Sequence, residues 1–171
     1  MADASDSKIV YLPETGDTSA LTTFREKFKK ITLAGGCFDI LHYGHIQFLK
    51  KSKAEGNALV ILLESDEALS RRKKRKPIHT QKQRAALLAA LSYVDGIVAL
   101  PHFEDDAEYE KVTLALKPSV IAITEGDPLS EKKEDQAKKV GGIMKVVTPQ
   151  IENLSTSSIT QHAALSSDKS S

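Results

Sequence analysis

The chain has no tryptophan and a single cysteine, Cys37, and none of its apolar runs approaches the ~20 residues that a transmembrane helix requires. One cysteine excludes an internal disulfide and fits a reducing compartment. Residues 1–10 also lack the apolar core of a secretory signal peptide. These absences predict a cytoplasmic protein without a membrane span.

Excess charge of either sign is also missing, because the formal net charge is only +1. The composition therefore gives no overall field for nucleic acid or a membrane surface, and we expect neither as a partner. A hydrophobic content of 40% and a length of 171 residues fit one globular domain. We place that domain at residues 20–165, between an N-terminal arm at 1–19 and a polar tail at 166–171.

The most informative stretch is residues 31–50, ITLAGGCFDILHYGHIQFLK, in which a short apolar run precedes Gly35 and Gly36. A helical pattern begins after His42 and His45, whose spacing places them on one face of the helix start. Glycines let the backbone approach a ligand, and a helix N-terminus attracts phosphate. Two imidazoles add hydrogen-bond donors for phosphoryl oxygens. We interpret this stretch as a phosphate site, with a capped helix bearing two surface histidines as the alternative.

Strands alternate with helices along the rest of the chain, which predicts a parallel sheet with right-handed crossovers. Core strands are expected at 31–34, 58–63, 97–100, 120–123 and 143–147, and helices at 20–29, 44–55, 80–92, 106–116, 130–140 and 155–165. Residues 8–12 form either a short edge strand or an extended arm. Thr18 or Ser19 is expected to cap the first helix, and Thr80 with Gln83 the helix at 80–92.

The predicted fold is α/β: a Rossmann-like, doubly wound, five-stranded parallel sheet in a single domain, with an N-terminal arm and helix. We expect the strand order 3-2-1-4-5 among the five core strands. Ligands of such sheets bind where the order reverses. This places Gly36, His42, His45 and the turn at Gly126-Asp127 around one crevice.

Six consecutive cations follow the second expected strand, from Arg71 to Lys76. Like charges repel one another, so we expect this run to resist forming a packed helix. Its position at the same edge of the sheet as the glycine turn favours a mobile phosphate-binding flap. A solvated loop, a nuclear-localisation signal and an RNA-binding run are the alternatives.

The segment GGCFDILHYGH, residues 35–45, resembles the G-x-F-D-x-x-H-x-G-H signature of the cytidylyltransferase-like nucleotidyltransferases. Those enzymes transfer a nucleotidyl group from ATP or CTP to a phosphorylated or alcohol acceptor and release pyrophosphate. Later segments that also resemble the family are Glu64-Ser65-Asp66, Lys76-Pro77-Ile78 with Gln83-Arg84, Ser92-Tyr93-Val94-Asp95 and Leu154-Ser155-Thr156-Ser157-Ser158-Ile159.

The resemblance implies a role for each matching residue. The implied catalytic residues are His42, His45 and Lys76. The implied nucleotide-binding residues are Gly36, Cys37, Phe38, Asp39, Gly44, Arg84, Gly126, Asp127, Ser155, Thr156 and Ser157. The implied acceptor-binding residues are Asp66 and Lys73. Ordinary helix capping is the alternative for Ser155 and Thr156. No residue is assigned to a resident metal, and Mg²⁺ is expected to arrive with ATP.

Within this family, GGCFD and VGGIMKVV (140–147) resemble the adenylyltransferase domain of ADP-heptose synthesis. Tyr43, where glycerol-3-phosphate cytidylyltransferases carry tryptophan, counts against a CTP enzyme. The turn at 123–128 lacks the lysine of the heptose group. The enzymatic alternatives are therefore a glycerol-3-phosphate-type cytidylyltransferase and an FMN adenylyltransferase. The implied function is transfer of AMP from ATP to a phosphorylated acceptor such as heptose 1-phosphate, in a homodimer. A nucleotide-binding sensor is the non-enzymatic alternative.

Overall fold

The computed structural model describes residues 6–149. The helix expected at 155–165, with Ser155, Thr156 and Ser157, lies outside the described residues. No helix between residues 6 and 149 is both long enough and apolar enough to cross a membrane.

Parallel strands form one sheet in the order β1-β4-β3-β2-β5-β6. The strands are β1 (Ile9–Tyr11), β2 (Ile31–Gly36), β3 (Ala58–Leu63), β4 (Gly96–Ala99), β5 (Val120–Thr124) and β6 (Ile143–Thr148). The last five follow the predicted order 3-2-1-4-5. The expected count of five strands is corrected to six, because β1 pairs with the backbone of β4 at the edge of the sheet. Residues 8–12 thus contribute an edge strand rather than a free arm.

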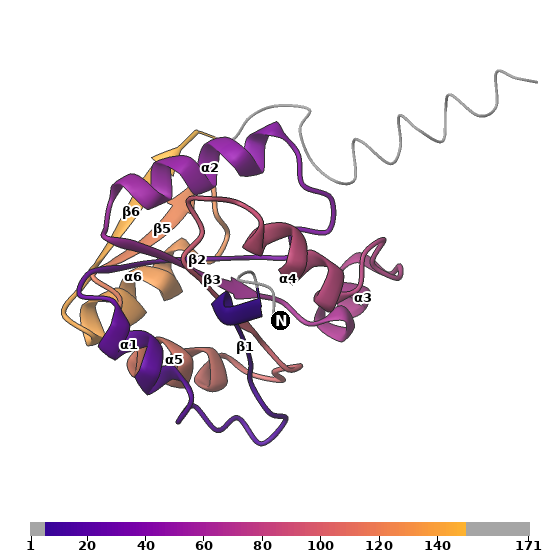
Figure 1. Ribbon diagram of the computed structural model, residues 1–171, viewed down its shortest axis with the longest axis horizontal. Coiled ribbons are helices and arrows are strands. Elements are labelled where there is room, and N and C mark those ends of the chain that lie inside the picture. The colour runs from indigo at the N-terminus through magenta and orange to yellow at the C-terminus, as the bar shows by residue number, and fades with distance from the viewer. Residues whose placement is uncertain (1–5, 150–171) are drawn as a thin grey trace, which may run out of the picture.

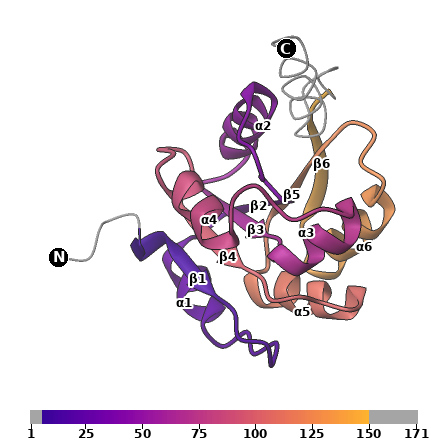
Figure 2. The same cartoon turned by 90° about the vertical axis from the view of Figure 1, so that its right-hand side faces the viewer.

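Helices cover both faces of this sheet, as the doubly wound prediction requires (Figure 1). They are α1 (Leu21–Lys27), α2 (Tyr43–Ala54), α3 (Asp66–Lys73), α4 (Gln81–Ala89), α5 (Asp106–Leu116) and α6 (Ser130–Lys139), with a short 3-10 helix η1 (Asp6–Lys8) before β1. Helices α2 and α4 lie on one face, and α1, α5 and α6 on the other. Figure 2 views the molecule from the side on which α3 lies.

The basic run is not a loop throughout, because α3 continues to Lys73 and ends at Lys74 in a left-handed conformation. The expectation that all six cations resist a helix is therefore wrong for the first three. Ser65 caps the start of α3, and basic residues in the last turn interact favourably with the helix dipole. Arg71 also pairs with Glu67 one turn earlier, at 2.6 Å.

The two predicted helix caps had different outcomes. Thr80 and Gln83 form the predicted capping box at the start of α4. The expectation that Thr18 or Ser19 caps α1 is wrong, since α1 has no side-chain cap. Ser19 instead donates from its backbone and hydroxyl groups to the Asp17 carboxylate, which favours a turn before the helix.

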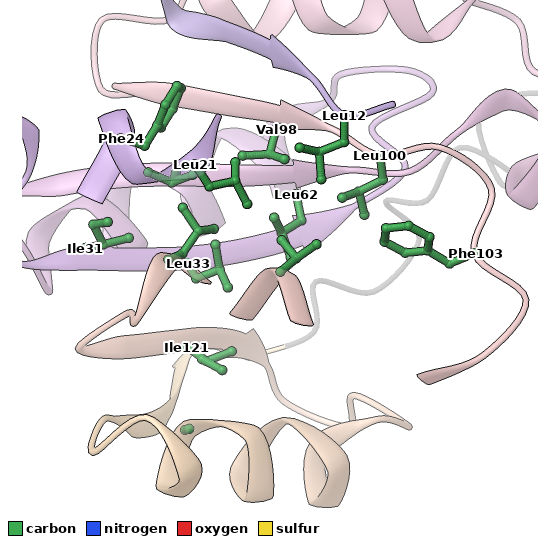
Figure 3. Close-up of a cluster of buried hydrophobic side chains, with 14 residues drawn as sticks. Leu12, Leu21, Phe24, Ile31, Leu33, Leu62, Val98, Leu100, Phe103 and Ile121 are labelled. Carbon is green, nitrogen blue, oxygen red and sulfur yellow. The ribbon is translucent and has the colours of Figure 1, made fainter. Parts of the chain in front are cut away.

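The core on the α1, α5 and α6 face joins leucines from neighbouring strands, among them Leu33 of β2 and Leu62 of β3 (Figure 3). Each residue of β3 is buried, as expected for a central parallel strand. Full burial of one such aliphatic side chain contributes roughly 1.5–3 kcal/mol. The packed sheet is therefore a rigid base for groups at the carboxyl ends of its strands.

Candidate functional site

A crevice with two lobes lies at the carboxyl ends of β2 and β5, where the strand order reverses. The narrow lobe, of about 310 Å³, lies toward α2, and the wide lobe, of about 590 Å³, lies toward α5 and α6. Seven residues line both lobes, and we call them the shared rim: Gly35, Gly36, Cys37, Lys73, Thr124, Asp127 and Lys133. The crevice is where ligands of open α/β sheets bind.

The two histidines stand together at the narrow lobe. His42 is the N-cap residue of α2, and His45 lies in the first turn of that helix. Their rings stack with centroids 3.8 Å apart and planes 22° apart. On its other side, His45 contacts the ring of Phe38 at 5.0 Å. The pair is thus fixed at the helix end, where amides lack partners within the helix.

Phe38 explains why Gly36 must be a glycine. Phe38 is buried and adopts a positive φ of 49°, which folds its ring back toward the end of β2. A Cβ at Gly36 would lie 2.9 Å from that ring. Any larger residue would therefore displace Phe38 and, through it, the ring of His45.

Both histidines are poor bases in this setting. Burial, assisted by the neighbouring His42 and by Lys73, lowers the pKa of His45 from 6.5 to about 4, while a backbone contact at Ile40 opposes the shift. Burial and Lys73 also lower the pKa of His42. At neutral pH both rings are therefore uncharged, and each offers one N–H donor to a ligand.

The lowered pKa of His45 predicts a pH-dependent stability. The unfolded chain takes up this proton near pH 6.5 and the folded chain only near pH 4. Stability from this group is therefore present above pH 6.5 and is lost as the pH falls toward 4, by at most about 3 kcal/mol. Urea unfolding of the wild type and of His45→Gln across this range isolates the effect. Parallel stability curves for the two proteins would contradict the prediction.

Asp39, a predicted nucleotide-binding residue, lines neither lobe and instead holds the segment after α3. Its buried carboxylate accepts hydrogen bonds from the amides of Ile78, at 2.8 Å, and His79, at 3.2 Å, and pairs with Arg75 at 2.9 Å. Burial alone would raise the pKa of Asp39, but these amides and Arg75 together lower it. Asp39 thus stays ionised and fixes the basic segment against the loop that follows β2.

Arg84 is fully buried and joins three separate backbone segments. Its guanidinium donates to the carbonyls of Cys37, Glu64 and His79, and it pairs with Asp66 at 2.7 Å. Arg84 and Asp66 therefore link the segments that follow β2 and β3 to α3 and α4. Neither residue lines a lobe, so their predicted ligand contacts are not brought to the site.

Lys73, and not Lys76, is the predicted flap cation that reaches the crevice. Lys73 lies on the shared rim, whereas Lys76 is exposed and lines neither lobe. Sequence reasoning missed Lys133, which reaches the rim from α6 and pairs with Asp127 at 2.7 Å. It also missed Arg72, which donates to the Cys37 thiol. Burial raises the pKa of that thiol although Arg72 opposes the shift, so Cys37 stays protonated.

Several other predicted residues also line the crevice. Those that line the crevice, besides the histidines and Lys73, are Gly36, Cys37, Phe38, Gly44, Gly126 and Asp127. No group of three or more histidine, cysteine or acidic residues between residues 6 and 149 is placed to hold a metal ion. The expectation that Mg²⁺ arrives with ATP stays a prediction.

Comparison with known proteins shows similarity along most of the chain. Residues 33–162 match the family model described as Cytidylyltransferase-like. Bifunctional protein HldE of Helicobacter pylori (strain HPAG1) is 45% identical over 102 residues, which are 59% of this chain and 21% of that protein. Bifunctional protein HldE of Campylobacter jejuni subsp. doylei is 39% identical over a stretch with the same coverage. The chain spans about a fifth of the length of these curated relatives.

Two solved structures are also similar. The lipopolysaccharide core biosynthesis protein from Thermoplasma volcanium GSS1 is 31% identical with a TM-score of 0.57, covering 71% of this chain and 96% of that chain. Pantoate-beta-alanine ligase from Francisella tularensis, complexed with beta-gamma ATP and beta-alanine, is 16% identical with a TM-score of 0.57, covering 90% and 73%. The second similarity shows the fold alone.

Proposed function

The chain belongs to the cytidylyltransferase-like family, and we propose that it transfers AMP from ATP to a phosphorylated acceptor, such as a sugar 1-phosphate, with release of pyrophosphate. The observation that carries this proposal is the stacked pair His42 and His45 at the start of α2, beside a glycine turn and Lys73. Donors grouped in this way suit a polyphosphate whose charge redistributes during the reaction.

In the proposed reaction, an acceptor phosphate oxygen attacks the α-phosphorus of ATP in line with the bond to the β-phosphate. One P–O bond forms and one breaks, and pyrophosphate leaves with the electron pair. No covalent enzyme intermediate is required, so catalysis consists of positioning and charge stabilisation. His42 and His45 donate to the α- and β-phosphates, and Lys73 and Lys133 neutralise charge at the shared rim. The substrate is MgATP, in which the phosphates carry the Mg²⁺.

The choice of ATP and of a sugar phosphate rests on resemblance. The segments 35–39 and 140–147 resemble the adenylyltransferase domain of ADP-heptose synthesis, which supports ATP over CTP. Similarity to a lipopolysaccharide core biosynthesis protein supports a sugar-derived acceptor. A homodimer and a cytoplasmic location also stay predictions, and light scattering of the purified chain tests the first.

A pyrophosphate-release screen tests the function. ATP and CTP are each supplied with Mg²⁺ against heptose 1-phosphate, glycerol 3-phosphate and FMN, and the products are identified by mass spectrometry. We expect release from ATP with heptose 1-phosphate and formation of the ADP-sugar. Release only from CTP would overturn the nucleotide assignment. Binding of ATP without release in the presence of each acceptor would indicate a sensor instead of an enzyme.

Substitution of single cations in the basic run tests which of them acts at the site. Lys73→Met should lower kcat/KM for ATP by about 10–100-fold, because it removes a cation from the shared rim. Lys74→Met is the matched control, because its side chain is exposed and lines neither lobe. Lys76→Met should behave like the control in steady-state kinetics. A larger loss for Lys76→Met than for Lys73→Met would contradict the placement of the site cation.

A further inference from the structure

The wide lobe carries groups that the proposed phosphate chemistry does not use. Resting on the proposed function, we infer that this lobe binds the acceptor, and that Glu64 selects an acceptor whose body carries hydroxyl groups. The phosphate of that acceptor then points toward the shared rim. Glu64 follows β3 directly and lines the wide lobe but not the narrow one.

Charge is distributed unevenly along the wide lobe. Lys73 and Lys133 lie on the shared rim, next to the narrow lobe where the histidines stand. The rim also holds Asp127, paired with Lys133, so Lys73 is its unbalanced charge. Away from the rim, the lining includes the cations Arg72 and Lys132 and the carboxylates Glu64, Asp106 and Glu125, so acidic groups exceed basic ones there by one. The Glu64 carboxylate repels a phosphate but accepts a hydrogen bond from a hydroxyl. A ligand with one anionic end and one hydroxylated end therefore fits in a single direction, with its phosphate toward the ATP site.

The Glu64 carboxylate is held in place for such a contact. The hydroxyl of Tyr109 donates to Oε2 of Glu64 at 2.9 Å. Burial, with Glu64 beside it, raises the pKa of Tyr109, so the hydroxyl stays protonated and acts as a donor. The ring of Phe103 packs edge-on against Tyr109 at 5.0 Å. Within residues 6–149, Oε1 of Glu64 has no hydrogen-bond partner and is free to accept from a ligand.

The other walls of the wide lobe suit a sugar or polyol. Gln136 of α6 lies 3.5 Å from the Thr113 hydroxyl through its Oε1, which leaves its amide N–H groups for a ligand. Hydroxyls both donate and accept, so they can satisfy a carboxylate and an amide. Leu33 and Leu62 supply an apolar floor for the C–H face of a ring. A volume of about 590 Å³ lies within the range of small-molecule sites.

The test combines kinetics with binding on the full chain. Pyrophosphate release from MgATP is measured with heptose 1-phosphate for the wild type and Glu64→Gln, which keeps the shape but removes the charge. We expect the KM for heptose 1-phosphate to rise about tenfold or more, with the KM for ATP unchanged. Calorimetry of heptose 1-phosphate with a non-hydrolysable ATP analogue present measures its affinity without turnover.

Two control variants separate recognition from folding. Glu26→Gln makes the same change on an exposed residue of α1, outside both lobes, and it should leave both KM values unchanged. Tyr109→Phe removes the hydrogen bond that orients Glu64. It should raise the acceptor KM less than Glu64→Gln does and leave kcat nearly unchanged. A merely structural role for Tyr109 would lower thermal stability and ATP affinity instead.

The outcomes distinguish this inference from the proposed function. A rise in the KM for ATP with an unchanged acceptor KM in Glu64→Gln would overturn the wide-lobe assignment and leave the function standing. Wild-type binding of heptose 1-phosphate that weakens in Glu64→Gln, without pyrophosphate release, would support the lobe and contradict the reaction. Pyrophosphate release with heptose 1-phosphate at equal efficiency in wild type and Glu64→Gln would overturn the selection by Glu64. Absence of both binding and release would overturn both proposals.

Discussion

Replacing His45 with alanine should lower turnover by about 10²–10⁴-fold while the affinity for ATP changes little. The ring is stacked against His42 at the start of α2 and faces the narrow lobe, so it is placed to donate to phosphate oxygens. Its donation strengthens as charge moves onto the leaving pyrophosphate, and interactions of that kind appear in kcat more than in binding. Pyrophosphate-release kinetics and calorimetry with an ATP analogue measure the two quantities separately. His42→Ala should behave in the same way.

The control must separate lost chemistry from lost packing, because His45 also contacts Phe38. His45→Gln retains an N–H donor and much of the volume, so it should recover part of the turnover that alanine loses. His102→Ala removes a histidine that is also largely buried but lines neither lobe, and it should leave kcat unchanged. Turnover within about threefold of the wild type in both His42→Ala and His45→Ala would contradict the mechanism.

The sheet could be predicted because each core strand has a recognisable apolar run in its own sequence. Residues 58–63 form a continuous apolar run between a helix and a polar turn, which is typical of a strand buried on both faces. The strand β1 is different, because it has only three residues and its outermost side chain, Tyr11, is about half exposed. Its pairing depends on the open edge of β4, which is a property of the assembled sheet rather than of residues 9–11.

The basic run shows how competing local effects can lead to a wrong prediction of secondary structure. Repulsion among like charges argued against a helix, but the Ser65 cap and the Glu67–Arg71 pair stabilise α3 through Lys73. The positive φ of Lys74 then ends it. Repulsion among exposed cations is screened by solvent and salt, whereas the Ser65 cap is a direct hydrogen bond from the Ala68 amide at 3.1 Å. The helix is what brings Lys73 to the shared rim.

The part of the site that lies within one contiguous motif could be predicted from the sequence. His42, His45 and the glycine turn lie within eleven residues, so their juxtaposition follows from strand, turn and helix geometry. Glu64 and Tyr109 are separated by 45 positions, and they meet only because α5 packs over the end of β3. Lys133 has the sequence context of a solvated helix face and gave no local signal. Contacts of this kind depend on tertiary packing, which periodicity does not report.

Arg84 also shows that a motif in the sequence does not reveal the contacts that a residue makes in the folded protein. The resemblance to the family assigns Arg84 to nucleotide binding. The structure shows instead that its guanidinium pairs with Asp66 and donates to backbone carbonyls. Arg84→Met should therefore destabilise the protein by about 3–5 kcal/mol, because it leaves buried carbonyls without donors and removes the charge partner of Asp66. For a chain of this size the melting temperature should fall by roughly 6–20 °C. Thermal and urea unfolding measure the loss.

The matched control for this loss is Lys82→Met, which makes a similar change on an exposed residue of α4. It should change stability by less than about 0.5 kcal/mol. Asp66→Asn should cost less than Arg84→Met, because the Asp66 side chain is 42% exposed and the carbonyl partners of Arg84 remain. If Arg84 instead acts mainly on a ligand, Arg84→Met will melt with the wild type and lose only nucleotide affinity. A melting curve and an ATP titration of the same sample therefore decide whether this arginine builds the crevice or binds within it.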